Sequence, residues 1–269
     1  MQDIASPRPR FDSMAAWTAA RQMVGANRDM LLAIGGVFFL LPSLIIALAV
    51  TPPQLPDGAT SEELWPILRE FYVGLLPWAV PAMVLSMAGT LALQLIMTDP
   101  ARPTVGQAIR RGFALTPSFL AAQLLFGLSL GAALGIASAI AALTGIAALV
   151  LAVAFAGIAA MIHFAMRFIL IAPVLAEEGE RNPVRLLQRS WALTRGQVGR
   201  LLLFVILLVL VFSIVTGLIS GVISAILAFT VPAQVQKVLD AAIASGFSAV
   251  GLVYFAAIQV AAYRQLSGR

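Results

Sequence analysis

Six long stretches of apolar residues, separated by short polar segments, constrain the fold of this chain more than any other feature. An α-helix needs about 20 predominantly apolar residues to cross a bilayer, and each stretch meets that length. The sequence therefore predicts an all-α polytopic membrane protein with six transmembrane helices. The predicted spans are Met30–Val50, Tyr72–Met97, Ser118–Leu143, Ile146–Ile171, Leu201–Phe229 and Ala241–Tyr263.

The composition agrees with a membrane setting. Of the 269 residues, 61% are hydrophobic and only 11% are charged, whereas about a quarter of the residues of a soluble domain are charged. A soluble fold of this length would lack polar residues to cover its surface. The chain has no cysteine, which excludes disulfides and thiolate metal sites.

The basic residues lie almost entirely in alternate gaps between the stretches. Cytoplasmic loops carry an excess of Lys and Arg, so this asymmetry predicts that both termini are cytoplasmic. We expect a cytoplasmic segment 1–29, a transmembrane domain 30–263 and a tail 264–269, in a bacterial inner membrane. The pattern favours anionic lipid as a partner and argues against nucleic acid. The arginines on the predicted cytoplasmic side are Arg8, Arg10, Arg21, Arg28, Arg102, Arg110, Arg111, Arg181, Arg185, Arg189, Arg195, Arg200, Arg264 and Arg269, against Arg69 and Lys237 on the other side.

Two segments are predicted on the outer side. Thr144-Gly145 forms a tight turn between the third and fourth spans. The acidic loop Thr51–Phe71 is expected to hold a short interfacial helix, because Thr60 and Glu63 have the spacing of a capping box. Glutamates in a first turn are more typical of dipole partners than of a catalytic pair.

The two long basic loops contain a repeated element. Arg111–Thr116 (RGFALT) matches Arg189–Thr194 (RSWALT), and each copy directly precedes a span. Helix-start residues lie upstream of both copies, and Ser13–Ala26 is a weaker candidate for a third copy. The pattern predicts three hairpins of spans, each preceded by a cytoplasmic amphipathic helix.

The second copy is predicted to be a helix over residues 183–194 that lies in the headgroup layer. Val184, Leu187 and Trp191 share one face, and Arg185 and Arg189 stack at i, i+4 on another. Two interpretations stay open for this helix. It is either a general surface anchor or a specific site for a lipid headgroup, with Arg185, Arg189 and Trp191 as contacts.

His163 and Arg167 are the ionisable residues within the six stretches, one helical turn apart on the fourth. A charge at the bilayer centre costs at least about 2.5–3.5 kcal/mol. No carboxylate lies within the stretches, so we expect the Arg167 guanidinium to reach the headgroup layer or a polar cavity. His163 is expected to bond a neighbouring helix through one of three glutamines: Gln94, Gln123 or Gln259.

Small residues recur every four positions in two spans. These are Gly127, Gly131 and Gly135 in the third, and Gly217, Gly221 and Ala225 in the fifth. Such spacing lets helices approach closely, and packing within the chain is favoured over an oligomer interface. Pro77 and Pro81 are expected to bend the second span.

The segments Pro173–Gly179 (PVLAEEG) and Arg189–Gly196 (RSWALTRG) together resemble the membrane-domain family of glycerophosphoryl diester phosphodiesterases. The resemblance implies a six-helix layout with an amphipathic helix leading into a span. Some members of that family also carry a soluble phosphodiesterase barrel, which needs about 250 residues. The catalytic histidine and metal-binding carboxylates of that barrel have no counterpart here. Ala192 stands where the family has a basic residue, so a headgroup contact at that position is not implied.

No metal-site, catalytic-triad or phosphate-loop pattern occurs in the sequence, so we expect neither an enzyme nor a bound cofactor. The preferred function is a non-catalytic accessory or scaffold module in lipid or envelope processes. The alternative is a small transporter or channel for a lipid-like or amphipathic solute. A polar cavity around Arg167 would favour the transporter, and a solid core with exposed grooves the accessory module. A protein partner or homo-oligomer is left open.

Overall fold

The computed structural model describes residues 10–56, 58, 60–101 and 103–268, and these residues form helices and connecting segments without a strand. Three of the arginines on which the predicted orientation depends, Arg8, Arg102 and Arg269, lie outside the described residues. Six helices are long and apolar enough to cross a membrane, which confirms the predicted fold class. The elements are α1 (Ser13–Ala26), α2 (Arg28–Gly35), the π-helix η1 (Gly36–Leu40), α3 (Leu41–Ala49), α4 (Ser61–Thr98), α5 (Val105–Leu143), α6 (Ala147–Arg167), α7 (Ile171–Glu178), α8 (Pro183–Thr194), α9 (Val198–Thr230) and α10 (Ala233–Ser267).

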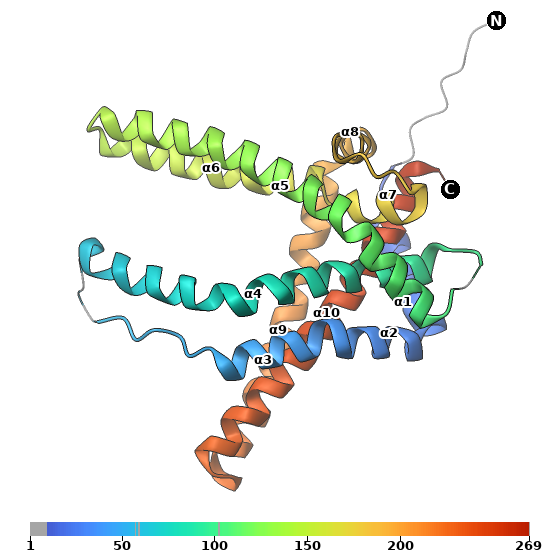
Figure 1. Cartoon of the computed structure of the whole chain (residues 1–269), viewed down its shortest axis with the longest axis horizontal. Helices are drawn as coiled ribbons and strands as arrows, with labels where there is room; N and C mark the ends of the chain where they lie inside the picture. The colour runs from blue at the N-terminus through green and yellow to red at the C-terminus, as the bar shows by residue number, and fades with distance from the viewer. Residues whose placement is uncertain (1–9, 57, 59, 102, 269) are drawn as a thin grey trace, which may run out of the picture.

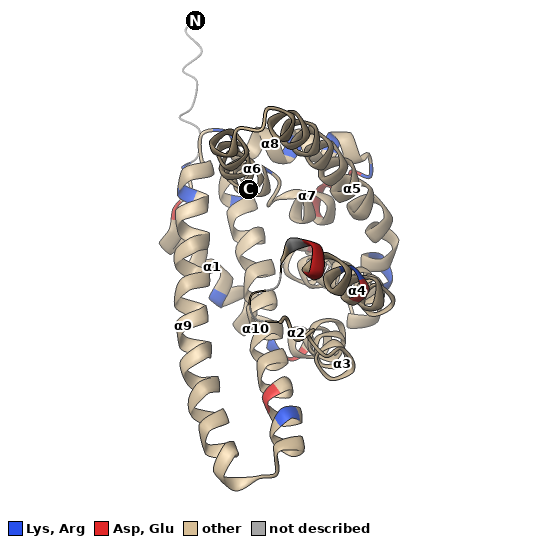
Figure 2. Ribbon diagram, turned by 90° about the vertical axis from the view of Figure 1, so that its left-hand side faces the viewer, with Lys and Arg blue, Asp and Glu red and all other residues tan. Residues whose placement is uncertain are grey.

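The spans form three pairs that fan out from one packed end (Figure 1). The first pair joins α2–η1–α3 to α4, the second is the hairpin of α5 and α6, and the third is the hairpin of α9 and α10. Figure 2 shows basic residues near α1, α5 and α8. We call this packed end, which also holds α7 and the last turns of α10, the arginine-bearing end.

The hydrophobic core is concentrated at the arginine-bearing end. It combines α7, the second half of α10 and the last turns of α4, and Phe11 and Ala16 join it from the start of the chain. By contrast, Leu201 is the one buried residue of α9, all of whose residues are described. The outer parts of the spans thus present apolar side chains outward, as a lipid environment requires.

The second span is longer than predicted. α4 begins at Ser61 and continues to Thr98, so the expected interfacial helix is the first part of α4 and not a separate element. The predicted capping box is confirmed, with the Thr60 N–H donating to Glu63 Oε2 at 2.9 Å. Pro77 and Pro81 lie inside α4 without interrupting it.

The first span contains a π-helical turn, and Pro42 gives the reason. Proline has no N–H, so the carbonyl of Phe38 loses its partner four residues on. The chain widens into η1 directly before this proline. Ser86 of α4 directs its hydroxyl to the freed Phe38 carbonyl at 3.5 Å.

The fourth span, predicted as Ile146–Ile171, continues to Glu178 but is interrupted after Arg167. α6 stops at Arg167, Phe168–Leu170 turn, and a new helix, α7, begins at Ile171. Pro173 favours this restart, because the N–H groups in the first turn of a helix have no partner within the helix and the missing N–H of proline costs nothing there. The restart places Pro173 in the first turn of α7, and the carbonyls at the end of α6 are left for other partners.

The two copies of the repeated element have different outcomes. The first copy continues without a break into its span as α5, so the expected separate helix before this span is wrong. The second copy is the separate helix α8, as predicted, and Gly196 (φ 78°) turns the chain between α8 and α9. The corresponding position after the first copy is Ser118, and Pro117 lies inside α5.

Equivalent residues of the two copies nevertheless make equivalent contacts. Arg111 pairs with Asp99 at the end of α4 at 2.6 Å, and Arg189 pairs with Glu178 at the end of α7 at 3.0 Å. The residue two positions after this arginine is aromatic in both copies. Phe113 contacts Phe38 of the first span, and Trp191 contacts the end of the fourth. The repeat is therefore a repeated docking mode as well as a repeated sequence.

Candidate functional site

α8 crosses the end of α6 and is fixed there by small polar side chains. Its buried face consists of Leu186, Ser190 and Thr194. The hydroxyls of Ser190 and Thr194 donate to the backbone carbonyl of Arg167 at 2.8 and 3.2 Å. Ser190 and Thr194 thus supply donors to a backbone carbonyl that has no partner within α6. The predicted face of Val184 and Trp191 remains exposed on the outside of α8.

This crossing brings together three of the predicted site residues, which we call the Arg167 site: Arg167, His163 and Trp191. The guanidinium carbon of Arg167 lies 4.4 Å from the centroid of the Trp191 ring, a cation–π distance. Its Nε donates to His163 Nε2 at 3.4 Å. Arg167 Nη1 is buried and has no hydrogen-bond partner among the described residues. A buried guanidinium nitrogen without an acceptor is unsatisfied, so an anionic oxygen would be stabilised there.

An apolar cavity of about 350 Å³ adjoins the Arg167 site between α5, α6 and α8. Phe164 and Phe168 line it, and both rings also contact Trp191, with centroids 5.8 and 5.9 Å apart. Leu125 and Leu187 contribute from α5 and α8. Trp191 thus contacts both the Arg167 guanidinium and two rings that line the cavity.

The two other predicted contacts, Arg185 and Arg189, lie away from Arg167 and pair with glutamates. Arg189 Nε donates to both carboxylate oxygens of Glu178, at 3.0 and 3.2 Å. Arg185 lies 3.5 Å from Glu180. The Asn182 backbone N–H, which donates to Glu180, and the charge of Arg185 lower the pKa of the Glu180 carboxyl.

α8 nevertheless presents a positive surface. Between residues 167 and 200 the chain has six arginines and three glutamates. Arg181, Arg195 and Arg200 are exposed and form no ion pair with a described residue. This excess of arginine surrounds the Arg167 site.

The glutamates of α7 hold the arginine-bearing end together. The buried Tyr263 donates its hydroxyl to Glu178 at 2.8 Å, and Arg264 lies 3.3 Å from Glu177. Arg264 also donates to the Met97 carbonyl at the end of α4. These contacts join α4, α7 and α10, and the pair of Arg189 with Glu178 fixes α8 to the same group.

The predicted glutamine partner of His163 is wrong. Gln94 of α4 donates to Gln259 of α10 at 2.8 Å inside the core, and Gln123 is exposed on α5. The pairing follows from the close packing of α4 and α10, which the sequence pattern does not show. His163 instead accepts from Arg167 on its own helix.

A polar cluster that the sequence did not predict lies near the far end of the α9/α10 hairpin. α10 begins at Ala233 and not near Ala241, so Asp240 lies inside the helix. Ser224 of α9 donates to its carboxylate at 3.0 Å, and the Gln236 amide donates to the Ser224 carbonyl. The i, i+4 spacing of Gln236 and Asp240, which places both on one helix face, is the feature of the sequence that indicates this cluster.

The glycine stripes also differ from the prediction. A Cβ placed on Gly127, Gly131 or Gly135 of α5 would meet nothing within 4 Å, and the same holds for Gly217 and Gly221 of α9. The prediction that these glycines pack closely against other helices of the chain is thus wrong. The glycine at which another backbone approaches closely is Gly112, where an added Cβ would lie 2.6 Å from the Ala88 carbonyl.

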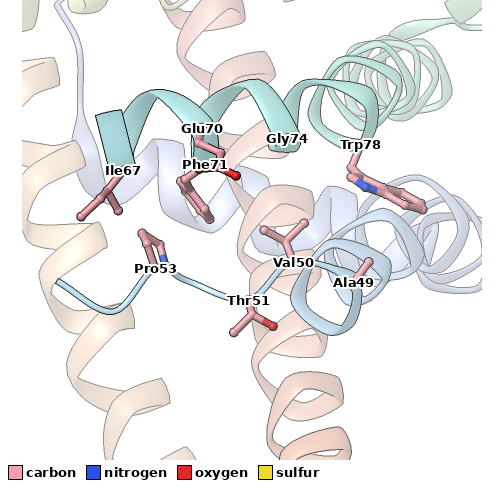
Figure 3. A pocket seen from close by; sticks show the side chains of 9 residues that line it. All are labelled: Ala49, Val50, Thr51, Pro53, Ile67, Glu70, Phe71, Gly74 and Trp78. Atoms are coloured by element: carbon pink, nitrogen blue, oxygen red, sulfur yellow. The ribbon is translucent and has the colours of Figure 1, made fainter. Parts of the chain in front are cut away.

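A further cavity, of about 350 Å³, lies at the opposite end, between the end of α3 and the start of α4. Figure 3 shows Glu70 and Phe71 of α4 above Thr51 and Pro53 of the loop. Glu70 is the one ionisable residue among those that line it, so the lining contains no pair of acid and base groups.

Among the described residues, no group of three His, Cys, Asp or Glu side chains comes together to hold a metal ion. No protein-family model, curated protein or solved structure matches the chain. The geometry of the Arg167 site is therefore the basis for the function proposed next.

Proposed function

We propose that the chain is a non-catalytic accessory or scaffold protein of lipid or envelope processes, which binds anionic lipid headgroups at the Arg167 site. The proposed setting is a bacterial inner membrane with both termini in the cytoplasm. The proposal keeps the resemblance to the membrane-domain family of glycerophosphoryl diester phosphodiesterases and concerns the membrane domain alone.

The observation that carries the proposal is the buried, partnerless Nη1 of Arg167 beside an apolar cavity. A guanidinium presents its donors in a planar fork that matches phosphate. Trp191 holds the guanidinium from one face, and the surrounding arginines add a long-range attraction for anionic lipid. The Arg167 guanidinium can contact the phosphate of a phospholipid, and the neighbouring apolar cavity can contact its acyl chains.

The same features support an accessory role over a transporter. The cavity beside Arg167 is lined by apolar side chains apart from Ser129, so it offers little to a hydrated solute. The core at the arginine-bearing end is tightly packed, and cavities open sideways between the helices. Lipid enters such openings from the membrane plane.

Thermal unfolding in nanodiscs tests the headgroup site. The protein should unfold at a higher temperature in phosphatidylglycerol than in phosphatidylcholine. Arg167→Gln should weaken binding of phosphatidylglycerol about tenfold or more, since a charge-assisted hydrogen bond contributes about 1.5–3 kcal/mol. Arg167→Lys should restore only part of the shift, because an ammonium lacks the planar fork.

Arg69→Gln is the matched control, because Arg69 is exposed at the other end of the molecule and should leave the lipid-dependent shift unchanged. Equal unfolding temperatures in both lipids, or a full shift in Arg167→Gln, would remove the headgroup site. Release of glycerol phosphate from a glycerophosphodiester by the purified protein would contradict the non-catalytic role.

A further inference from the structure

A cavity of about 650 Å³ lies between the first span and the α9/α10 hairpin, apart from the Arg167 site. Leu31 and Leu40 lie on the wall formed by the first span. Ile243, Phe247 and Val250 lie on the facing wall. Because both walls belong to membrane-spanning helices, the natural filling of this space is hydrocarbon.

The cavity has one charged end and one apolar end. Arg28 and Tyr254 line it at the arginine-bearing end, and Leu40 and Ile243 line its inner part. Twelve residues separate Arg28 from Leu40, or about 18 Å along a helix. The hydrocarbon core of a bilayer is about 30 Å thick, so the cavity is about one leaflet deep. A cation at the surface above an apolar slot of this depth has the shape of a phospholipid binding site.

Arg28 is available to a headgroup. Its side chain is 77% exposed, and its recorded ion-pair partner is the neighbouring Asp29 at 3.4 Å, which is 88% exposed. An exposed pair of this kind contributes little, about 0–1 kcal/mol, so a phosphate can take the place of Asp29.

Two glycines, one on each wall, show that the slot is open. A Cβ placed on Gly36 or on Gly246 would meet nothing within 4 Å. Both residues line the cavity, so a side chain added at either position would begin in open space. The chain thus leaves this volume unfilled between two of its own helices.

We propose that this slot holds one acyl chain of an anionic phospholipid, with the lipid phosphate at Arg28. The proposed site uses a different arginine and different helices from the Arg167 site, and it does not depend on the function proposed above. It predicts a lipid that stays with the protein, in contrast to the exchanging lipids that cover the outer faces of α5, α6 and α9.

Photo-crosslinking in nanodiscs tests the slot. The probe is phosphatidylglycerol with a photoreactive group near the end of one acyl chain, at low abundance in phosphatidylcholine. Labelling should concentrate on peptides that contain Leu40, Ile243 and Phe247. Gly36→Leu and Gly246→Leu should each reduce this labelling several-fold, and Arg28→Gln should reduce it when phosphatidylglycerol competes with phosphatidylcholine.

Gly127→Leu is the matched control, since Gly127 also has open space around it and lies outside the cavity. It should leave the labelling of the slot unchanged. A cooperative unfolding transition in phosphatidylcholine at the melting temperature of the native chain would show that each slot variant is folded. Even labelling of all outward faces, or slot labelling that survives both leucine substitutions, would mean surface lipid only and overturn the proposal. Crosslinks between two copies of the chain at the slot would overturn it in favour of a protein occupant.

Discussion

Proline has a different consequence at each of three positions within or beside the apolar stretches. Pro42 follows a π-helical turn, and the freed Phe38 carbonyl faces a hydroxyl of α4. Pro173 restarts the helix, and α8 supplies hydroxyls to the end of α6. Pro117 lies inside the unbroken α5. At Pro42 and at the break before Pro173, hydroxyls of neighbouring helices bond the nearby backbone carbonyls, and these contacts are remote in sequence.

Glu180 gives a pH-dependent prediction at the start of α8. Its pKa is lowered in the folded protein by the Asn182 backbone N–H and by Arg185. A folded pKa below the unfolded value means that the contribution to stability is complete above the unfolded pKa, about 4.3. It is lost as the pH falls through the folded pKa. The melting temperature should therefore fall on acidification into this range.

Glu180→Gln is the control, because the amide does not titrate. The variant should melt slightly below the native chain at neutral pH, and the difference should vanish at the acidic end. A constant difference across the pH range would contradict a role for the Glu180 charge. Differential scanning fluorimetry in zwitterionic lipid measures both curves without a change in headgroup charge.

The contact between α4 and α5 depends on one glycine. A Cβ on Gly112 would lie 2.6 Å from the Ala88 carbonyl and 3.1 Å from the Ala92 nitrogen, and backbone atoms cannot move aside cheaply. Gly112→Ala should thus destabilise the protein by about 1–3 kcal/mol, the usual cost of overpacking. Gly106→Ala, on the same helix with nothing within 4 Å, should be neutral or slightly stabilising. Equal melting temperatures for the two variants would contradict close packing at Gly112.

The existence of the helices was predictable from the sequence, and several of their ends were not. Hydropathy reports which residues prefer lipid, but a helix continues wherever its hydrogen bonds continue. α4 and α5 accordingly extend beyond their apolar stretches, by eleven and thirteen residues at their starts. α5 is about 58 Å long, nearly twice the thickness of a hydrocarbon core.

The candidate site was predictable as a set of residues but not as an arrangement. Arg167 and His163 are conspicuous because they interrupt an apolar stretch, and Trp191 because it belongs to the repeated element. Their meeting depends on the break at Phe168 and on α8 crossing α6, which are tertiary features. Asp240 was missed because the predicted sixth span began one residue after it.

At the scale of the whole molecule, packing and lipid exposure are divided between the two ends. The arginine-bearing end has a core of its own, and the outer parts of the three pairs of spans diverge (Figure 1). Diverging helices leave apolar space between them, which lipid must fill. The fan shape therefore explains why the cavities beside α6 and beside the first span open between helices.

The orientation gives a prediction for the whole molecule. The six candidate spans of the described residues bring the start and the end of the chain to the same side, and from the arginine asymmetry we predict that this side is the cytoplasm. A reporter enzyme that is active only outside the cytoplasm should be silent when fused after Arg269. Inserted at Gly145, in the turn between α5 and α6, it should be active. The reverse pattern would invert the orientation, and equal activity at both positions would contradict the number of spans.

The contact of α1 with α10 determines when the protein can finish folding during its synthesis. Asp12 exchanges two hydrogen bonds with Gln265, and the Trp17 ring stacks on Tyr254, so the first described helix packs on the last. α10 also has eleven buried residues, nine of which belong to the hydrophobic core. A nascent chain with five inserted spans has no α10 on which its earlier helices can close. Its partial core stays in contact with lipid until α10 has been inserted, and we expect a ribosome stalled before residue 245 to leave an unassembled chain that membrane proteases remove.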